Sequence, residues 1–233
     1  MDTPRYRTAL IVGAGPGFSA SFARLCIRAG LNVALAARNT AKLAEFCADT
    51  GASAYPCDAR DPHDVAGLFD AVEARQGTPD LVLYNAAGRV RGPVVDLDPE
   101  SVRQSIEVSA FGAFLVAQQA ARRMLPKRHG AIVLTGATAG VKGFANSSAF
   151  AMGKFALRGL AQSLARELSP QGIHVAHIVI DGGIRSEAWP DPETAPDSTL
   201  DPAAIAETCW HVLHQHRSAW SWEVEVRPWV ERF

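Results

Sequence analysis

The chain has 233 residues, of which 48% are hydrophobic and 20% are charged, with a formal net charge of −1 and a pI of about 6.7. This composition is sufficient for one large core, and the lack of a basic excess argues against nucleic acid or an anionic membrane as a partner. No apolar run approaches the ~18 residues of a membrane helix, and the roughly nine residues before the first apolar strand leave no room for a secretory signal. The four cysteines lack zinc-site spacing, so we expect free thiols, no metal site and a cytoplasmic location.

In chain order, the residue pattern predicts a strand at 8–12, a helix at 19–29, a strand at 31–37, a helix at 40–50, a strand at 52–57, a helix at 62–76, a strand at 81–84, a helix at 99–124, a strand at 131–135, a helix at 149–168, a strand at 174–180, a helix at 202–216 and a strand at 223–227. Strands that alternate with helices favour right-handed crossovers and a parallel sheet covered by helices on both faces. We therefore predict an α/β fold in which residues 1–233 form a single doubly wound domain.

A glycine-rich turn follows the first predicted strand and leads into the first helix. Its sequence is Gly13-Ala14-Gly15-Pro16-Gly17-Phe18-Ser19, which fits the spacing GxxxGxG with Ser19 in the last place and does not fit GxGxxG. Glycines here let the backbone approach a pyrophosphate, and the helix N-terminus offers free N–H groups. We predict that Gly13, Gly15, Gly17 and Phe18 contact a dinucleotide; an ordinary glycine-rich turn is the alternative.

The ends of the second and third strands indicate which dinucleotide binds. An acidic residue after the second strand would bind the ribose 2′-hydroxyl of NAD, but this chain has Arg38 and Asn39 there. Because a cation pairs with a 2′-phosphate, we predict NADP(H) in preference to NAD(H); a solvated Arg38 is the alternative. Asp58, followed by Ala59, ends the third strand, and we expect it either to accept a hydrogen bond from the adenine amino group or to serve as a turn residue.

Five motifs, in their order and spacing, resemble those of the short-chain dehydrogenase/reductase family over about residues 6–186. They are Gly13-x-x-x-Gly17, Cys57-Asp58, Asn85-Ala86-Ala87-Gly88, Phe150-x-x-x-Lys154 and the segment from Gly182 to Ser186. The resemblance implies a Rossmann fold with a parallel sheet of about seven strands, a dinucleotide across the strand ends, and hydride transfer to or from a carbonyl or alcohol carbon. It also implies cofactor contacts from Asn85, Ala86, Ala87, Gly88, Gly183, Ile184 and Ser186.

The family's active site uses Asn, Ser, Tyr and Lys, and this chain departs from that set at three of the four positions. Ser109 stands for the Asn, Ala137 for the Ser and Phe150 for the Tyr, and only Lys154 matches. In the family, Lys lowers the Tyr pKa and holds the nicotinamide ribose, and Tyr protonates the nascent alkoxide. A phenyl ring cannot donate a proton. Residues i and i+4 share a helix face, so Lys154 can keep the ribose contact without a phenol.

Several groups are candidates for a replacement proton donor. They are Thr138 beside the lost Ser, Ser147 and Ser148 upstream of Phe150, Ser109, and a water relayed through Lys154. A serine hydroxyl is a poor acid without an activating partner, so a structural role for each hydroxyl is the alternative. Stacking of Phe150 on the substrate or nicotinamide would favour an apolar, already activated acceptor.

Three further features complete the predictions. By resemblance, residues 185–202 form a substrate lid, with a solvated surface loop as the alternative. The outer face of the helix at 105–123 is expected to pack on a second subunit in a homodimer or homotetramer. His211, His214 and His216 invite a metal hypothesis, but they also fit the exposed side of a helix, and we predict no metal.

These observations favour an NADP(H)-dependent oxidoreductase of the short-chain type with an atypical active site, acting on a small-molecule carbonyl, imine or activated C=C. A catalytically impaired dinucleotide-binding pseudoenzyme, acting as a sensor or partner subunit, is the alternative. A structural subunit without a cofactor is a third reading, which the glycine turn and Arg38 disfavour.

Overall fold

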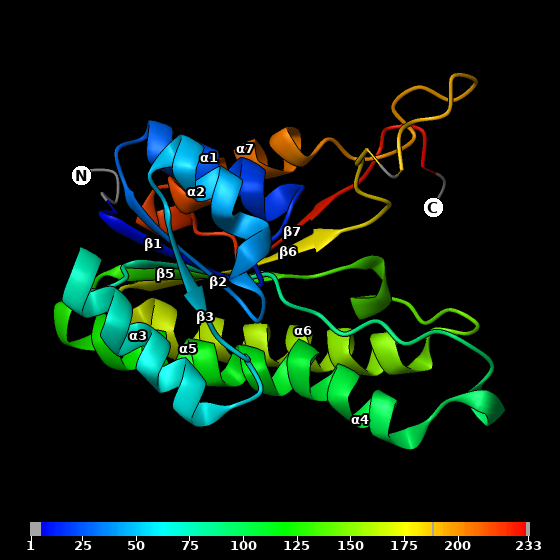
Figure 1. The fold of residues 1–233 in the computed structure, drawn as a ribbon, viewed down its shortest axis with the longest axis horizontal. Helices are drawn as coiled ribbons and strands as arrows, with labels where there is room; N and C mark the ends of the chain where they lie inside the picture. The colour runs from blue at the N-terminus through cyan, green and yellow to red at the C-terminus, as the bar shows by residue number, and fades with distance from the viewer. Residues whose placement is uncertain (1–5, 188, 232–233) are drawn as a thin grey trace.

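The computed structural model describes residues 6–187 and 189–231, and its strands form one parallel sheet in the order β3-β2-β1-β4-β5-β6-β7 (Figure 1). The strands are β1 (Thr8–Val12), β2 (Asn32–Ala37), β3 (Ser53–Pro56), β4 (Leu81–Tyr84), β5 (Gly130–Thr135), β6 (Ile173–Ile180) and β7 (Glu223–Val226). The strand order reverses between β1 and β4. In doubly wound sheets a ligand crevice lies outside the carboxyl ends of the strands at this point.

Seven α-helices cover the two faces of the sheet in the described part of the chain. They are α1 (Phe18–Arg28), α2 (Ala44–Thr50), α3 (Pro62–Gln76), α4 (Pro99–Ile106), α5 (Gly112–Met124), α6 (Ser148–Leu168) and α7 (Pro202–Leu213). In Figure 1, α1, α2 and α7 lie on one side of the sheet, and α3, α4, α5 and α6 on the other. The predicted doubly wound α/β fold is therefore confirmed.

The core consists of two apolar clusters, one on each face of the sheet. Successive strand residues alternate between them, so that Leu10 and Val12 face one cluster, and Ala9 and Ile11 the other. Every residue of β1, β4, β5 and β6 is buried. This burial on both faces explains why these strands are continuous apolar runs rather than alternating patterns.

Helix boundaries follow local capping signals. Asp61, Asp98 and Asp201 each accept hydrogen bonds from backbone N–H groups at the start of α3, α4 and α7, and a proline occupies the first helical position after each of them. A side-chain acceptor at the N-cap followed by proline satisfies the free N–H groups and presets the backbone. These signals account for the agreement of the predicted and observed starts of all three helices.

The predicted helices at 40–50 and 99–124 differ in detail from the structure. The first consists of a 3₁₀ turn, Thr40–Leu43, followed by α2. The second is continuous, but a π-helical stretch, Glu107–Phe111, separates α4 from α5. A π-stretch widens the helix locally, and such stretches are frequent at functional sites. It contains Ser109, which is buried.

The edge strand β7 is joined to α6 by an ion pair. Arg158 Nη2 lies 2.6 Å from Glu223 Oε1, and Nδ1 of the fully buried His177 lies 3.0 Å from Glu223 Oε2. Burial lowers the pKa of His177, so its imidazole is neutral near pH 7. These contacts join β7 to β6 and to the middle of α6.

The described residues contain no helix long and apolar enough to cross a membrane. In the same part of the chain, no three His, Cys, Asp or Glu side chains are grouped to hold a metal. The histidines after Trp210 have local roles instead: Nδ1 of His214 lies 2.8 Å from the Trp210 carbonyl oxygen, and Nδ1 of His216 lies 2.8 Å from Ser218 Oγ. His216 lies beyond the end of α7, because the helix stops at Leu213 and not at residue 216 as predicted.

Candidate active site

Three cavities adjoin one another along the carboxyl edge of the sheet. The first, of about 550 Å³, is lined by Val12, Gly13, Ala14, Ala37, Arg38, Asn39, Lys42, Cys57, Asp58, Ala59, Asn85, Ala86, Ala87 and Val108. The second, of about 690 Å³, shares Asn85 and Ala87 with the first and contains Ala137, Thr138, Phe150 and Lys154. The third, of about 510 Å³, shares Ala14 and Lys42 with the first and includes Gly15, Gly17 and Ser19. Most of the residues predicted to bind a dinucleotide therefore lie along one continuous groove.

The glycine turn has the geometry of a phosphate cradle. At Gly13, with φ of 85°, an added Cβ would lie 2.3 Å from the Ala86 nitrogen, so only glycine lets β1 approach the end of β4 this closely. Ser19 Oγ donates to the Gly15 carbonyl at 2.9 Å and accepts from the Gly15 N–H at 3.0 Å. An added Cβ at Gly15 or Gly17 would meet nothing within 4 Å, so the turn is open on the side where a phosphate would lie.

Three predicted cofactor contacts do not line these cavities. The Phe18 side chain is buried in the core against Phe22, so a contact from this residue is restricted to its backbone. Gly88 packs against Ser105 on α4, where an added Cβ would lie 2.5 Å from the Ser105 Cα. The Ser186 N–H donates to the Trp189 carbonyl oxygen. The signal at Gly88 and Ser186 was motif membership alone, which does not distinguish packing from ligand contact.

The end of β2 places two cations in the first cavity. Arg38 lines it as predicted, and Asn39 caps the following 3₁₀ turn by accepting from the Ala41 N–H at 3.0 Å. That turn brings Lys42 to the same wall, a residue that sequence reasoning missed. A second cation four residues after Arg38 was the available signal.

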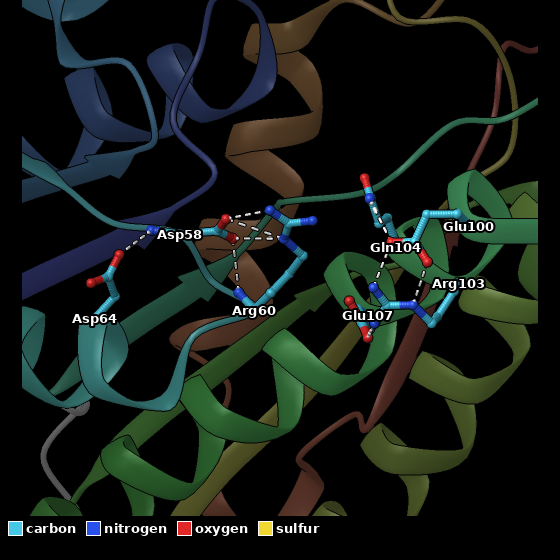
Figure 2. Close-up of polar contacts among 7 residues, drawn as sticks. All are labelled: Asp58, Arg60, Asp64, Glu100, Arg103, Gln104 and Glu107. Carbon is cyan, nitrogen blue, oxygen red and sulfur yellow. Dashed lines mark hydrogen bonds and ion pairs between the residues drawn. The ribbon is translucent and has the colours of Figure 1, made fainter.

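Asp58 lines the first cavity, and Figure 2 shows its carboxylate turned toward Arg60. Arg60 Nη2 lies 2.6 Å from Asp58 Oδ2, and the Arg60 N–H donates to Asp58 Oδ1 at 3.0 Å. This hydrogen-bonded pairing lowers the pKa of Asp58. The turn role is therefore present in the structure, and the adenine contact stays a prediction.

A separate charged cluster lies on α4 beyond Asp58 and Arg60. Arg103 pairs with Glu100 and Glu107, and Gln104 donates to Glu100 (Figure 2). These side chains are exposed or half-buried, and exposed ion pairs contribute little to stability. None of the four side chains lines the three cavities, so we assign the cluster no role in the site.

Lys154 is the central polar residue of the second cavity. It is only 3% exposed, and its Nζ donates to the carbonyl oxygen of Thr135, the last residue of β5, at 2.6 Å. Burial, assisted by the charge of Arg89, lowers the pKa of Lys154 to about 7. An amine with this pKa exchanges protons readily at neutral pH.

Two cations lie near the Phe150 ring. Lys154 Nζ is 5.9 Å from its ring centroid, consistent with the shared helix face expected for residues i and i+4. The second cation is Arg89, whose guanidinium carbon lies 5.0 Å from the same centroid. Arg89 and Arg91 follow the Asn85–Gly88 motif in the chain, and both line the second cavity. The sequence analysis did not identify either residue.

The candidate replacement donors are divided by the structure. Thr138 and Ser147 line the second cavity, whereas Ser109 and Ser148 do not. Ser109 is fully buried, and its Oγ accepts from the Gly88 N–H at 3.1 Å. The π-stretch thus uses Ser109 to hold the loop after β4, which favours the structural alternative for this residue.

The segment predicted as a lid is a folded loop in its described parts, 185–187 and 189–202. Asp191 accepts from the Thr199 N–H at 2.9 Å and pairs with Arg185, which also pairs with Asp201. Trp189 is 59% exposed, yet it lines the second cavity and lies 3.6 Å from the position of a Cβ added to Gly183. The loop therefore contributes an aromatic wall, while lid movement stays a prediction.

Comparisons with known proteins agree with this geometry. A family model described as short chain dehydrogenase matches residues 7–192. The 3-oxoacyl-[acyl-carrier-protein] reductase MabA of Mycobacterium avium is 31% identical over 181 residues, which are 78% of this chain and 68% of that protein. A short-chain dehydrogenase structure from Rhodopseudomonas palustris is 33% identical with a TM-score of 0.83, covering 97% of this chain and 100% of its own.

A second solved structure is similar over nearly the whole chain. It is a metagenomic short-chain oxidoreductase in complex with NADP, 26% identical with a TM-score of 0.83 and covering 95% of this chain and 97% of its own. The family match spans the glycine turn, the loop after β4 and the Phe150–Lys154 pair. This chain belongs to the short-chain dehydrogenase family.

Proposed function

We propose that the chain is an NADP(H)-dependent oxidoreductase with an atypical active site, in which a buried lysine and not a tyrosine is the proton source. The observation that carries this proposal is the groove itself. It runs from an open glycine turn to Lys154, and at its catalytic end a phenyl ring and a methyl group, Phe150 and Ala137, stand where hydroxyl donors belong in the family. Small carbonyl, imine or activated C=C compounds are the proposed acceptors.

The residues present fit the dinucleotide. The first turn of α1, which begins at Phe18 and has no side-chain cap, offers N–H groups that suit its pyrophosphate, and Arg38 with Lys42 suits a 2′-phosphate. Asp58 and Ala59, which line the first cavity, would hold the adenine end, and Lys154 in the second cavity would hold the ribose at the nicotinamide end. When bound, the reduced cofactor supplies the hydride. NADP(H) is preferred because Arg38 and Asn39, rather than an acid, directly follow β2, and Lys42 lines the same cavity as Arg38.

The chain's own residues then perform three tasks. The Thr135 carbonyl fixes the Lys154 ammonium at the cavity wall, and burial keeps its proton transferable near neutral pH. Phe150 and Trp189 supply apolar walls on the substrate side. The hydroxyls of Thr138 and Ser147 line the space where a substrate oxygen would accept a hydrogen bond. A substrate that is already activated needs less acid catalysis, so it suits this arrangement best.

The proposal is tested by titrating the protein with NADPH and NADH, followed by turnover with a panel of ketones, enones and imines. Cofactor binding is followed by fluorescence, and turnover by loss of NADPH absorbance. Binding with turnover of enones or imines supports the oxidoreductase. Binding without turnover across the whole panel would favour the pseudoenzyme. The observation in favour of that alternative is the loss of both hydroxyl donors, at Ala137 and Phe150.

Substituting Arg38 with Ala is expected to weaken NADPH binding by about 10- to 100-fold, because a charge-assisted hydrogen bond to the 2′-phosphate is lost. NADH lacks this phosphate, so its affinity is expected to change less than about threefold by the same reasoning. Fluorescence titration of both cofactors measures the two effects. Lys42→Ala should act in the same direction, and equal weakening of NADPH and NADH would overturn the cofactor choice.

We further propose that the exposed apolar face of α5 and α6 binds a second copy of the chain. Phe111 and Phe114 are 46% and 41% exposed, and Met152 and Phe155 on α6 are 54% and 45% exposed. Exposed apolar side chains in such number mark an interaction surface. Replacing Phe155 with Asp is expected to shift the protein toward monomer in sedimentation experiments, whereas Val95→Asp, at an exposed site outside α5 and α6, should not.

A further inference from the structure

The second cavity carries an excess of positive charge. Arg89, Arg91 and Lys154 line it, and none of the described residues along its wall is acidic. Within residues 6–187 and 189–231, neither Arg89 nor Arg91 has a carboxylate at ion-pair distance. The nearby Arg185 differs, because Asp191 and Asp201 neutralise it. An unneutralised pair of guanidinium groups at a cavity wall attracts an anion.

The dinucleotide does not account for these arginines. Its phosphate-binding features, the glycine turn with Arg38 and Lys42, line the first and third cavities, and Arg89 and Arg91 line neither of them. The two arginines lie on the substrate side instead, in a cavity that also contains Ala137 and Phe150. Their anion must therefore come from another molecule.

The position of Arg89 is held by packing. Its guanidinium lies over the Phe150 ring at 5.0 Å, which limits its motion at a site where a tyrosine would be expected. Desolvation and the charge of Arg91, which lines the same cavity, both lower the pKa of Arg89. The group stays charged, because arginine does not lose its proton in proteins at neutral pH.

Apolar and aromatic side chains form another part of the cavity wall. It includes Phe144, Ile180, Ile184 and Trp189, and the volume of about 690 Å³ is that of a small-molecule site. A ligand that satisfies both parts has an apolar body and one anionic end. The planar fork of a guanidinium donates two parallel hydrogen bonds, which match the two oxygens of a carboxylate.

We propose that the substrate of this protein is a small carbonyl or activated C=C compound that bears a carboxylate, and that Arg89, assisted by Arg91 and backed by Phe150, binds that carboxylate. This inference rests on the proposed oxidoreductase function for the identity of the reacting group. The anion site itself is independent of turnover. Arg89 is thus a specificity-determining residue.

The test measures binding by calorimetry, with and without bound NADP⁺, so that no chemistry is required. The probes are two matched pairs: 4-formylbenzoate with its methyl ester, and 4-oxopentanoate with its methyl ester. In the unmodified protein at least one carboxylate is expected to bind about 10- to 100-fold more tightly than its ester, the range for a charged hydrogen-bonded pair.

Arg89→Met retains an apolar stem over Phe150 and removes the charge. It is expected to abolish the preference for the carboxylate while leaving the ester affinity unchanged within about twofold, because the apolar walls remain. Lys142→Met is the matched control: Lys142 lies 5.7 Å from the Phe144 ring but does not line the cavity. It should leave the preference intact.

Equal affinity for acid and ester, no binding of either pair, or equal losses in Arg89→Met and Lys142→Met would each overturn the proposal. Unaltered thermal unfolding of both variants confirms that the fold is preserved. A carboxylate preference without turnover of any acceptor would contradict the oxidoreductase function and support the anion site. Turnover without a carboxylate preference would support the oxidoreductase function and contradict the anion site.

Discussion

Ketone reduction by the Phe150→Tyr variant is expected to exceed that of the unmodified protein by about 10²–10⁴-fold, the contribution typical of a positioned general acid. Phe150 lines the second cavity beside Lys154, whose Nζ lies 5.9 Å from its ring centroid. A phenol at this position would lie next to a cation, which lowers its pKa. The measurement is the initial rate of NADPH oxidation with an unactivated ketone.

The second hydroxyl that this chain lacks, at Ala137, can be restored as well. Adding Ala137→Ser to Phe150→Tyr restores a donor for the developing oxyanion, and a further gain of up to about 10²–10³-fold is expected, without strict additivity. Phe150→Leu is the control, since it alters packing without adding a hydroxyl, and it should give no gain. If the double variant binds NADPH normally but reduces no ketone, Phe150 is not equivalent in position to the family's catalytic Tyr. The cavity would then differ from the family's active site in more than these two hydroxyl groups.

The Lys154→Met variant is expected to lose at least about 10²-fold in turnover of any acceptor the protein reduces, because the proposed proton source is removed. In the unmodified protein, the rate of reduction should fall as pH rises through about 7, since only the protonated amine donates. Lys154→Met should abolish this pH dependence. A pH-independent rate in the unmodified protein would contradict the role of Lys154 as the acid.

The same substitution separates catalysis from stability. The folded-state pKa of Lys154, about 7, lies below its unfolded value, so the unfolded chain binds more protons between these two values. The free energy of unfolding therefore rises with pH over that interval. A neutral methionine avoids the burial of a charge, and Lys154→Met is expected to be more stable by about 1–3 kcal/mol at pH 6. Chemical denaturation at pH 6 and pH 9 measures this, and destabilisation at pH 6 would indicate a mainly structural lysine.

The fold was predictable because its signals are local. Apolar runs, helical spacing and the Asp-Pro starts of α3, α4 and α7 depend only on near neighbours in the chain, and together they determine a parallel sheet with helices on both faces. The π-stretch at Glu107–Phe111 was not predictable, because it depends on how that helix packs on its neighbours.

The site divides in the same way. The sequence by itself determined the glycine turn, Arg38 and the shared face of Phe150 and Lys154, since each depends on spacing within a few residues. Only the tertiary structure decided that Arg89 lies over Phe150, that Lys42 joins Arg38, and that Ser109 binds Gly88 outside the cavity. These contacts join segments from different strand ends or require knowledge of which face is buried. The burial that lowers the pKa of Lys154 arises from the same long-range packing, because desolvation is a property of the assembled core and not of any short segment.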